Sequence, residues 1–128
     1  MEPERLADRM AAILDNKKAL RIEKLDITKR TPIADFFVVC SGTSTTHVRA
    51  LADELQFQLN REGISVGHVE GYDSARWILL DYGDVAAHIF VEQERDFYSL
   101  ERLWSPANFR LRTRLSRTHD EAQPEGEV

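Results

Sequence analysis

The chain has 128 residues, of which 42% are hydrophobic and 30% charged, and its net charge is −5. This length suits one domain with a core of its own. The acidic balance argues against nucleic-acid binding by counterion release, which needs clustered basic side chains. The single Cys excludes a disulfide framework, and no apolar run approaches the roughly 20 residues of a membrane helix. The composition therefore predicts a soluble, intracellular protein with neither a membrane nor a specific nucleic acid as its partner.

The N-terminal segment has the apolar spacing of an amphipathic helix. Pro3 suits its first turn, and its stripe consists of Leu6, Met10, Ile13 and Leu14. A strand-like stretch over residues 20–27 follows, and Thr31-Pro32 interrupts the pattern after it. The continuous apolar run at 36–40 then predicts a strand that is buried on both faces.

A second helix is predicted from about Thr45 to Arg61, between Ser44 as its N-cap and Gly63 just beyond its C-terminal end. Phe57 lies nine residues after Val48, which places it about half a turn away from the apolar face. We therefore expect Phe57 to point toward solvent and to contact a second copy of the chain or another partner. The predicted buried face consists of Val48, Leu51, Ala52, Leu55 and Leu59.

The second half of the chain carries three further strand signals and a third helix. The strands are expected at 64–70, 76–81 and 85–91, and the Tyr82-Gly83 turn makes the last two an antiparallel hairpin. The strand–helix–strand unit before them should be a right-handed parallel crossover. The third helix has its apolar positions at Phe97, Leu100, Leu103 and Trp104.

This order predicts an α/β or α+β domain with a mixed five-stranded sheet flanked by helices. The domain should span residues 1–105. Residues 106–128 are expected to form a flexible tail, because apolar periodicity fades after Trp104 and charges segregate there. Its basic part carries Arg110, Arg112, Arg114 and Arg117, and acids follow at the end.

One pattern suggests nucleotide chemistry. The turn at 41–44 between a buried strand and a helix offers backbone N–H groups and hydroxyls to an anion. With Asp81 and Asp84 as magnesium ligands, this resembles a nucleotidyltransferase arrangement. However, the turn lacks a lysine and a second glycine, and the two acids flank a hairpin turn. The simpler interpretation is that Ser44 caps a helix and the acids stabilise a turn.

Other catalytic or metal-binding interpretations are weaker. Cys40 and His88 could form a nucleophile–base pair, but a lone Cys within an apolar strand is typically a small buried hydrophobe. The histidines are scattered, without the close spacing of zinc ligands. We expect no catalytic residue, no metal site and no cofactor.

The stretch at 70–84 combines aromatic residues, alternating apolar residues and acids, as an interface hot spot requires. Along a strand, side chains alternate between faces. Trp77, Leu79 and Asp81 therefore share one face of the sheet, and Ile78, Leu80 and Tyr82 share the other. The sequence leaves open which of these faces packs under the helices.

At these residues the chain resembles the ribosomal silencing factor family, also called RsfS or Iojap. The resemblance covers about residues 5–105, in register and without large insertions. The matching segments are IADFFVVCSGTS at 33–44, HVRALAD at 47–53, VEG at 69–71, WILLDYGDV at 77–85, HIF at 88–90 and FYSLERLW at 97–104.

The resemblance implies a non-enzymatic, cytoplasmic function. Members bind protein number fourteen of the large ribosomal subunit, block joining of the small subunit sterically, and lower translation when nutrients are short. The implied fold is related to nucleotidyltransferases but lacks their catalytic set, and homodimers are common. The implied ribosome contacts are Glu70, Trp77, Leu79, Asp81, Tyr82 and Asp84, with Trp77 and Tyr82 as apolar anchors and the others as rim or support.

The loop before Trp77 departs from the family pattern. Ser74-Ala75 stands where the resemblance leads us to expect a glycine in many relatives. The resemblance therefore does not predict the conformation of this loop.

Overall fold

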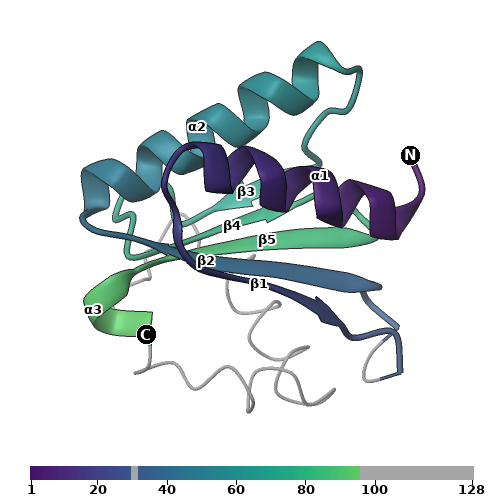
Figure 1. The fold of residues 1–128 in the computed structure, drawn as a ribbon, viewed down its shortest axis with the longest axis horizontal. Helices are drawn as coiled ribbons and strands as arrows, with labels where there is room; N and C mark the ends of the chain where they lie inside the picture. The colour runs from purple at the N-terminus through teal and green to yellow at the C-terminus, as the bar shows by residue number, and fades with distance from the viewer. Residues whose placement is uncertain (30–31, 96–128) are drawn as a thin grey trace.

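A computed structural model describes residues 1–29 and 32–95. Two long helices and five strands make up most of the described chain (Figure 1). In chain order the elements are α1 (Pro3–Asn16), β1 (Leu20–Asp26), β2 (Phe36–Gly42), α2 (Thr45–Arg61), β3 (His68–Glu70), β4 (Trp77–Asp81), β5 (Val85–Val91) and α3 (Glu92–Arg95).

The strands form one mixed sheet in the order β1-β2-β5-β4-β3. β2 and β5 pair in parallel, whereas β1–β2, β5–β4 and β4–β3 are antiparallel. The predicted five-stranded mixed sheet and the β4–β5 hairpin are thus confirmed. β3 runs in the same direction as β2, as a parallel crossover through α2 requires, but β5 and β4 lie between the two strands. The hand of this crossover stays a prediction.

Both long helices cover the same face of the sheet (Figure 1). α1 and α2 pack against each other and against β2 and β5. Alternate strand residues, among them Val38, Cys40 and Ile89, point into this helix-side core and are fully buried. The predicted apolar stripes of both helices are confirmed, because all of their residues are buried there: Leu6, Met10, Ile13, Leu14, Val48, Leu51, Ala52, Leu55 and Leu59.

A second, smaller apolar cluster lies on the opposite face of the sheet. Phe37 and Val39 from β2 and Phe90 from β5 are buried in it, and Trp77 and Leu79 from β4 pack against it. β2 is therefore buried on both faces along its whole length, as its continuous apolar run predicts.

The ends of α2 are those that the sequence predicts. The Ser44 hydroxyl accepts a hydrogen bond from the backbone N–H of His47 at 3.1 Å, which makes Ser44 the N-cap. At the other end Gly63 has a φ of +83°, and the N–H of Ile64 donates to the carbonyl of Leu59.

The strand predicted over 64–70 is shorter in the structure, where β3 spans only His68–Glu70. The prediction was wrong for 64–67 because Ile64 belongs to the turn that closes α2. The first cross-strand bond to β4 comes from Gly67, whose N–H donates to the carbonyl of Asp81 at 2.8 Å.

The last described element, α3, ends at Arg95. The predicted third helix with Phe97 and Trp104, the domain boundary near residue 105 and the tail at 106–128 all lie outside the described residues. Within the described ranges, none of the helices has the length and apolar character needed to cross a bilayer.

Candidate functional site

The register of β4 decides which face carries Trp77. Ile78 and Leu80 are buried in the helix-side core, so Trp77 and Leu79 point to the opposite face. Trp77 lies opposite Phe90 in the β4–β5 ladder, and Leu79 lies opposite His88. We call the sheet surface around these two half-buried side chains, Trp77 and Leu79, the Trp77 face.

Trp77 is held in place by an aromatic cluster. Its indole lies 4.9 Å from the ring of Phe90, and the ring of His88 lies 4.4 Å from that of Phe37. The Trp77 Nε1–H donates a hydrogen bond to His88 Nδ1 at 3.0 Å. Because an indole nitrogen can only donate, Nδ1 of His88 carries no proton in this arrangement. His88 is therefore a positioning residue for Trp77.

The acids of the predicted contact set occupy different environments. Glu70 faces Leu79 across the β3–β4 ladder, but it is only 4% exposed, and its carboxylate lies 2.6 Å from His68 Nε2. Asp81 is half-buried, and its carboxylate accepts a hydrogen bond from the N–H of Gly83 at 2.8 Å. The side chain of Asp84 is exposed at the hairpin turn. Glu70 is thus buried, whereas Asp84 is accessible at the surface.

Tyr82 does not share the Trp77 face. It packs against the helix-side core, and among the described residues its buried hydroxyl has no hydrogen-bond partner. Burial raises the pKa of Tyr82 to about 12. The two aromatic residues expected as joint anchors therefore lie on different sides of the sheet. Phe57 is also remote from the Trp77 face, on the outer surface of α2, and it is exposed as predicted.

The loop that leads into Trp77 is fixed by close backbone packing and by α2. Gly71 has a φ of +80°, and a Cβ there would lie 2.2 Å from the carbonyl oxygen of Trp77. The Arg49 guanidinium on α2 donates to the carbonyl of Tyr72 at 3.1 Å, and the Tyr72 hydroxyl donates to Asp53. These contacts determine where β4 begins and hence where Trp77 stands.

The structure does not assemble Cys40 and His88 into a catalytic pair. Cys40 points into the helix-side core and His88 toward the Trp77 face, so the sheet separates them. Burial raises the pKa of the Cys40 thiol to about 12. Because the thiolate is the reactive form, this thiol is inert in the folded chain. This agrees with the interpretation of Cys40 as a small buried hydrophobe.

The inertness of Cys40 can be measured. At pH 8 we expect iodoacetamide to alkylate the native protein at least 100-fold more slowly than the urea-unfolded chain, whose thiol is exposed and ionises near pH 9. The folded thiol has the higher pKa, so its burial stabilises the fold below about pH 9. That contribution is lost as the pH rises toward 12. Equal alkylation rates in the two states would contradict the buried position.

The elements of a nucleotidyltransferase site are also apart. Gly42 pairs with Val91 at one end of the sheet, whereas Asp81 pairs with Ala86, which in turn pairs with Phe37 at the other end. The turn itself is used internally, because the ring of His47 accepts from the N–H of Thr43. No group of three or more acidic, His or Cys side chains suited to a metal occurs among the described residues. The capping interpretation of the turn is the one that the geometry supports.

Comparison with known proteins identifies the family. The family model described as ribosomal silencing factor during starvation matches residues 1–127. The chain belongs to this family. A ribosomal silencing factor, RsfS, of Bacillus subtilis is 44% identical over 97 residues, which cover 76% of this chain and 82% of that protein.

Solved structures confirm the fold expected from the resemblance. A crystal structure of a Chromobacterium violaceum protein matches with a TM-score of 0.77 at 34% identity, covering 81% of this chain and 87% of the other. A Bacillus halodurans crystal structure matches with a TM-score of 0.68 at 39% identity, covering 80% and 92%. The chain is thus a member of the ribosomal silencing factor family, which is not a family of enzymes.

Ala75, which stands in the loop before Trp77 where many RsfS relatives are expected to have a glycine, has an unusual backbone conformation. Ala75 is fully buried and has a φ of +59°, a left-handed backbone conformation that favours glycine. The chain therefore retains the conformation that suits glycine although the glycine is absent. We ascribe this to the anchoring of the loop at Gly71 and by Arg49.

Proposed function

We propose that this RsfS-family protein binds the large ribosomal subunit through its protein number fourteen and sterically blocks joining of the small subunit. The block lowers translation when nutrients are short. The observation that carries the proposal is the Trp77 face, where a half-buried indole is fixed by His88 and Phe90 beside Leu79. We also propose a cytoplasmic location and homodimerisation, on the strength of the family resemblance.

The proposed contact roles follow from position on the sheet. Trp77 and Leu79 are the apolar anchors, because they share one face and are half-buried in the free protein. Asp81 and Asp84 form the rim at the hairpin end of β4. Glu70 supports the face from β3 through its contact with His68. Tyr82 supports β4 from the opposite side of the sheet, where it packs against the helix-side core.

Charge supports a protein partner over RNA. The chain carries a net charge of −5, and acids adjoin the Trp77 face. Ribosomal proteins are generally basic at their exposed edges, so complementary charge would speed association and fix the orientation. Phosphate groups of RNA would be repelled by the same acids.

Names of relatives point to the same subunit. A mouse relative, 28% identical over 105 residues that cover 80% of this chain and 46% of that protein, is named mitochondrial assembly of ribosomal large subunit protein 1. We extend this association with the large subunit to the present chain as part of the proposal.

Comigration with isolated subunits tests the proposal. In sucrose gradients the purified protein should sediment with large subunits and stay at the top with small subunits. Raising the salt concentration should weaken this association, because exposed rim charges are screened. Sedimentation with neither subunit, or equally with both, would contradict the proposed partner.

A further inference from the structure

Residues 109–115, which follow the described part of the chain, alternate apolar and basic side chains. They read Phe-Arg-Leu-Arg-Thr-Arg-Leu, with the basic side chains at Arg110, Arg112 and Arg114. No acid occurs among residues 105–118, although the whole chain has a net charge of −5. We call residues 109–115 the arginine segment. Its chemistry complements an acidic surface that has an apolar centre.

A row of acids borders the Trp77 face at the hairpin end of the sheet. Asp35 directly precedes β2, Asp84 directly precedes β5, and Asp81 ends β4. The N–H of Asp35 donates to the carbonyl of Asp84 at 2.7 Å, and Asp81 lies opposite Ala86, two residues after Asp84. Because β2, β5 and β4 are neighbours, the three acids follow one another across the sheet. We call Asp35, Asp84 and Asp81 the acidic row.

Other surface acids already pair with bases of the described chain. Arg9 binds Glu62, and Lys24 binds two carboxylates of α1. Within residues 1–29 and 32–95, no base lies within ion-pair distance of the Asp35 or Asp84 carboxylate. These two carboxylates therefore offer negative charge to a basic segment.

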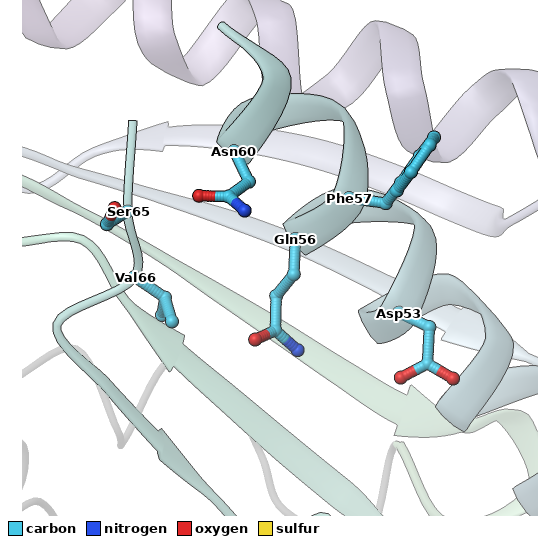
Figure 2. Close-up of a pocket in the computed structure, with 6 residues that line it drawn as sticks. All are labelled: Asp53, Gln56, Phe57, Asn60, Ser65 and Val66. Carbon is cyan, nitrogen blue, oxygen red and sulfur yellow. The ribbon is translucent and has the colours of Figure 1, made fainter. Parts of the chain in front are cut away.

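The open groove on the helix side is a poorer match for the arginine segment. It has a volume of about 440 Å³, and its lining residues are Asp53, Gln56, Phe57, Asn60, Ser65 and Val66 (Figure 2). Asp53 is the one acid in this lining, and its carboxylate already accepts a hydrogen bond from the Tyr72 hydroxyl at 3.0 Å. Phe57 points away from the groove (Figure 2). The groove thus offers neither a row of acids nor an apolar centre.

We propose that the arginine segment covers the Trp77 face of its own chain and restrains the protein from binding its partner. The segment crosses β4, β5 and β2 in an extended conformation, in which successive side chains point to opposite sides. Its arginines lie along the acidic row, and its apolar side chains lie over Trp77 and Leu79. Covering these half-buried side chains removes apolar surface from water.

The spacing of the charges agrees with this arrangement. Neighbouring strands lie about 4.8 Å apart, so the acidic row spans about 10 Å from β2 to β4. In an extended chain, Arg110 and Arg114 lie on one side and about 13 Å apart. Asp84 is the middle of the row and Arg112 is the middle arginine, so these two meet whichever way the segment runs.

The chain is long enough to reach the acidic row. Arg95, the last described residue, donates to the Ser41 hydroxyl at 3.0 Å and so lies at the other end of β2 from Asp35. The seven residues of β2 extend over about 23 Å. The 14 residues from 96 to 109 can span about 46 Å.

The segment and a basic ribosomal partner would compete for the Trp77 face. A face that is covered for about two-thirds of the time binds its partner about threefold more weakly. Only this restraining effect rests on the proposed function, because the contact itself does not need the ribosome.

Nuclear magnetic resonance without ribosomes tests the contact. Because the buried Cys40 thiol is inert, a nitroxide can be attached selectively to the variant Ser116→Cys, next to the arginine segment. The nitroxide should broaden the amide signals of Leu79 and Asp84 more than that of Asp15, which lies on α1. When nitroxide and isotope label are on separate chains in a mixture, this broadening should be absent. Equal broadening in the mixture would assign the contact to another copy and overturn the proposal.

Exchange of charges tests the arrangement. Arg112→Asp and Asp84→Arg should each remove most of the broadening at Leu79, and the chain with both substitutions should recover it. Arg117→Asp is the matched control, because it makes the same charge change as Arg112→Asp just outside the segment, and it should leave the broadening unchanged. Broadening that is absent from the wild-type chain, or that Arg112→Asp does not reduce, would overturn the proposal. A double variant that recovers nothing would overturn the pairing of the middle charges.

Binding to purified large subunits tests the restraint. Arg112→Asp should strengthen binding about threefold, whereas Arg117→Asp should leave it unchanged. Weaker binding by Arg112→Asp would indicate that the arginines contact ribosomal RNA and would overturn the restraint. If neither the wild-type chain nor Arg112→Asp binds large subunits, the proposed function fails, and the nitroxide experiment still decides the contact.

Discussion

Replacing Trp77 with Ala is expected to weaken binding to the large ribosomal subunit by about 30-fold or more. Truncating a central aromatic anchor typically costs at least about 2 kcal/mol of binding free energy, and each 1.4 kcal/mol is about tenfold in affinity. Trp77 is half-buried on the face of β4 opposite the helices, and Phe90 and His88 fix its orientation. Binding of a fluorescently labelled protein to purified large subunits measures the loss.

Phe57→Ala is the matched control for Trp77→Ala. It also removes an aromatic ring, but from the opposite side of the molecule, so subunit binding should be unchanged. Trp77→Ala also deprives His88 of its donor, and its folding must be checked. Asp84→Arg serves as a second variant, because that side chain is exposed and its reversal should slow association several-fold. Unchanged binding by folded Trp77→Ala and Asp84→Arg would remove the Trp77 face from the contact.

Gly71→Ala should destabilise the fold by about 3 kcal/mol or more. The left-handed backbone costs a side-chain-bearing residue about 1 to 2 kcal/mol, and overpacking adds about 1 to 3 kcal/mol. Overpacking is expected because the new Cβ would lie 2.2 Å from the carbonyl oxygen of Trp77. Relief requires the start of β4 to move, so the position of Trp77 should change as well. Urea unfolding measures the loss of stability.

Gly63→Ala separates the two contributions to this loss. Gly63 has nearly the same backbone angle, with a φ of +83°, but a Cβ there meets nothing within 4 Å. We expect this variant to lose only the conformational term of about 1 to 2 kcal/mol and to bind the large subunit normally. Equal destabilisation by the two substitutions would show that the close approach of Gly71 to Trp77 does not constrain the loop.

The spacing of apolar residues was sufficient to predict the two long helices and the most buried strand. The stripes of α1 and α2 recur with the helical repeat, and both bury the predicted residues. The run at 36–40 lacks alternation because both faces of β2 are covered. The caps at Ser44 and Gly63 could be predicted because each residue type has a local reason to stand there.

Contacts between distant strands could not be read from the sequence. Alternation grouped Trp77 with Leu79, but the side they occupy depends on which face α1 and α2 cover. The pairing and register of the strands also decide that Cys40 and His88 lie on opposite faces of the sheet, and that Asp81 lies at the far end of the sheet from Gly42. The bond from Trp77 to His88 was missed because the two residues are diagonal neighbours in a ladder whose register only the fold defines.

The sequence gives weaker indications of the short length of β3 and of the backbone conformation at Ala75. The prediction of a strand from residue 64 rested on the apolar residues Ile64 and Val66, and it did not consider Gly67, a residue type that weakens a strand. For Ala75 the local sequence gave no sign of a left-handed conformation, which is rare for alanine. Only the expectation of a glycine in related chains pointed to this loop.

Light scattering by purified ribosomal subunits in magnesium tests the central claim most directly. Small subunits are added to large subunits that have been preincubated with the protein, with its Trp77→Ala variant, or with buffer. The proposed function predicts that the wild-type protein abolishes the joining signal and that the variant restores most of it at the same concentration. Normal joining in the presence of saturating wild-type protein would contradict the proposed silencing of the large subunit.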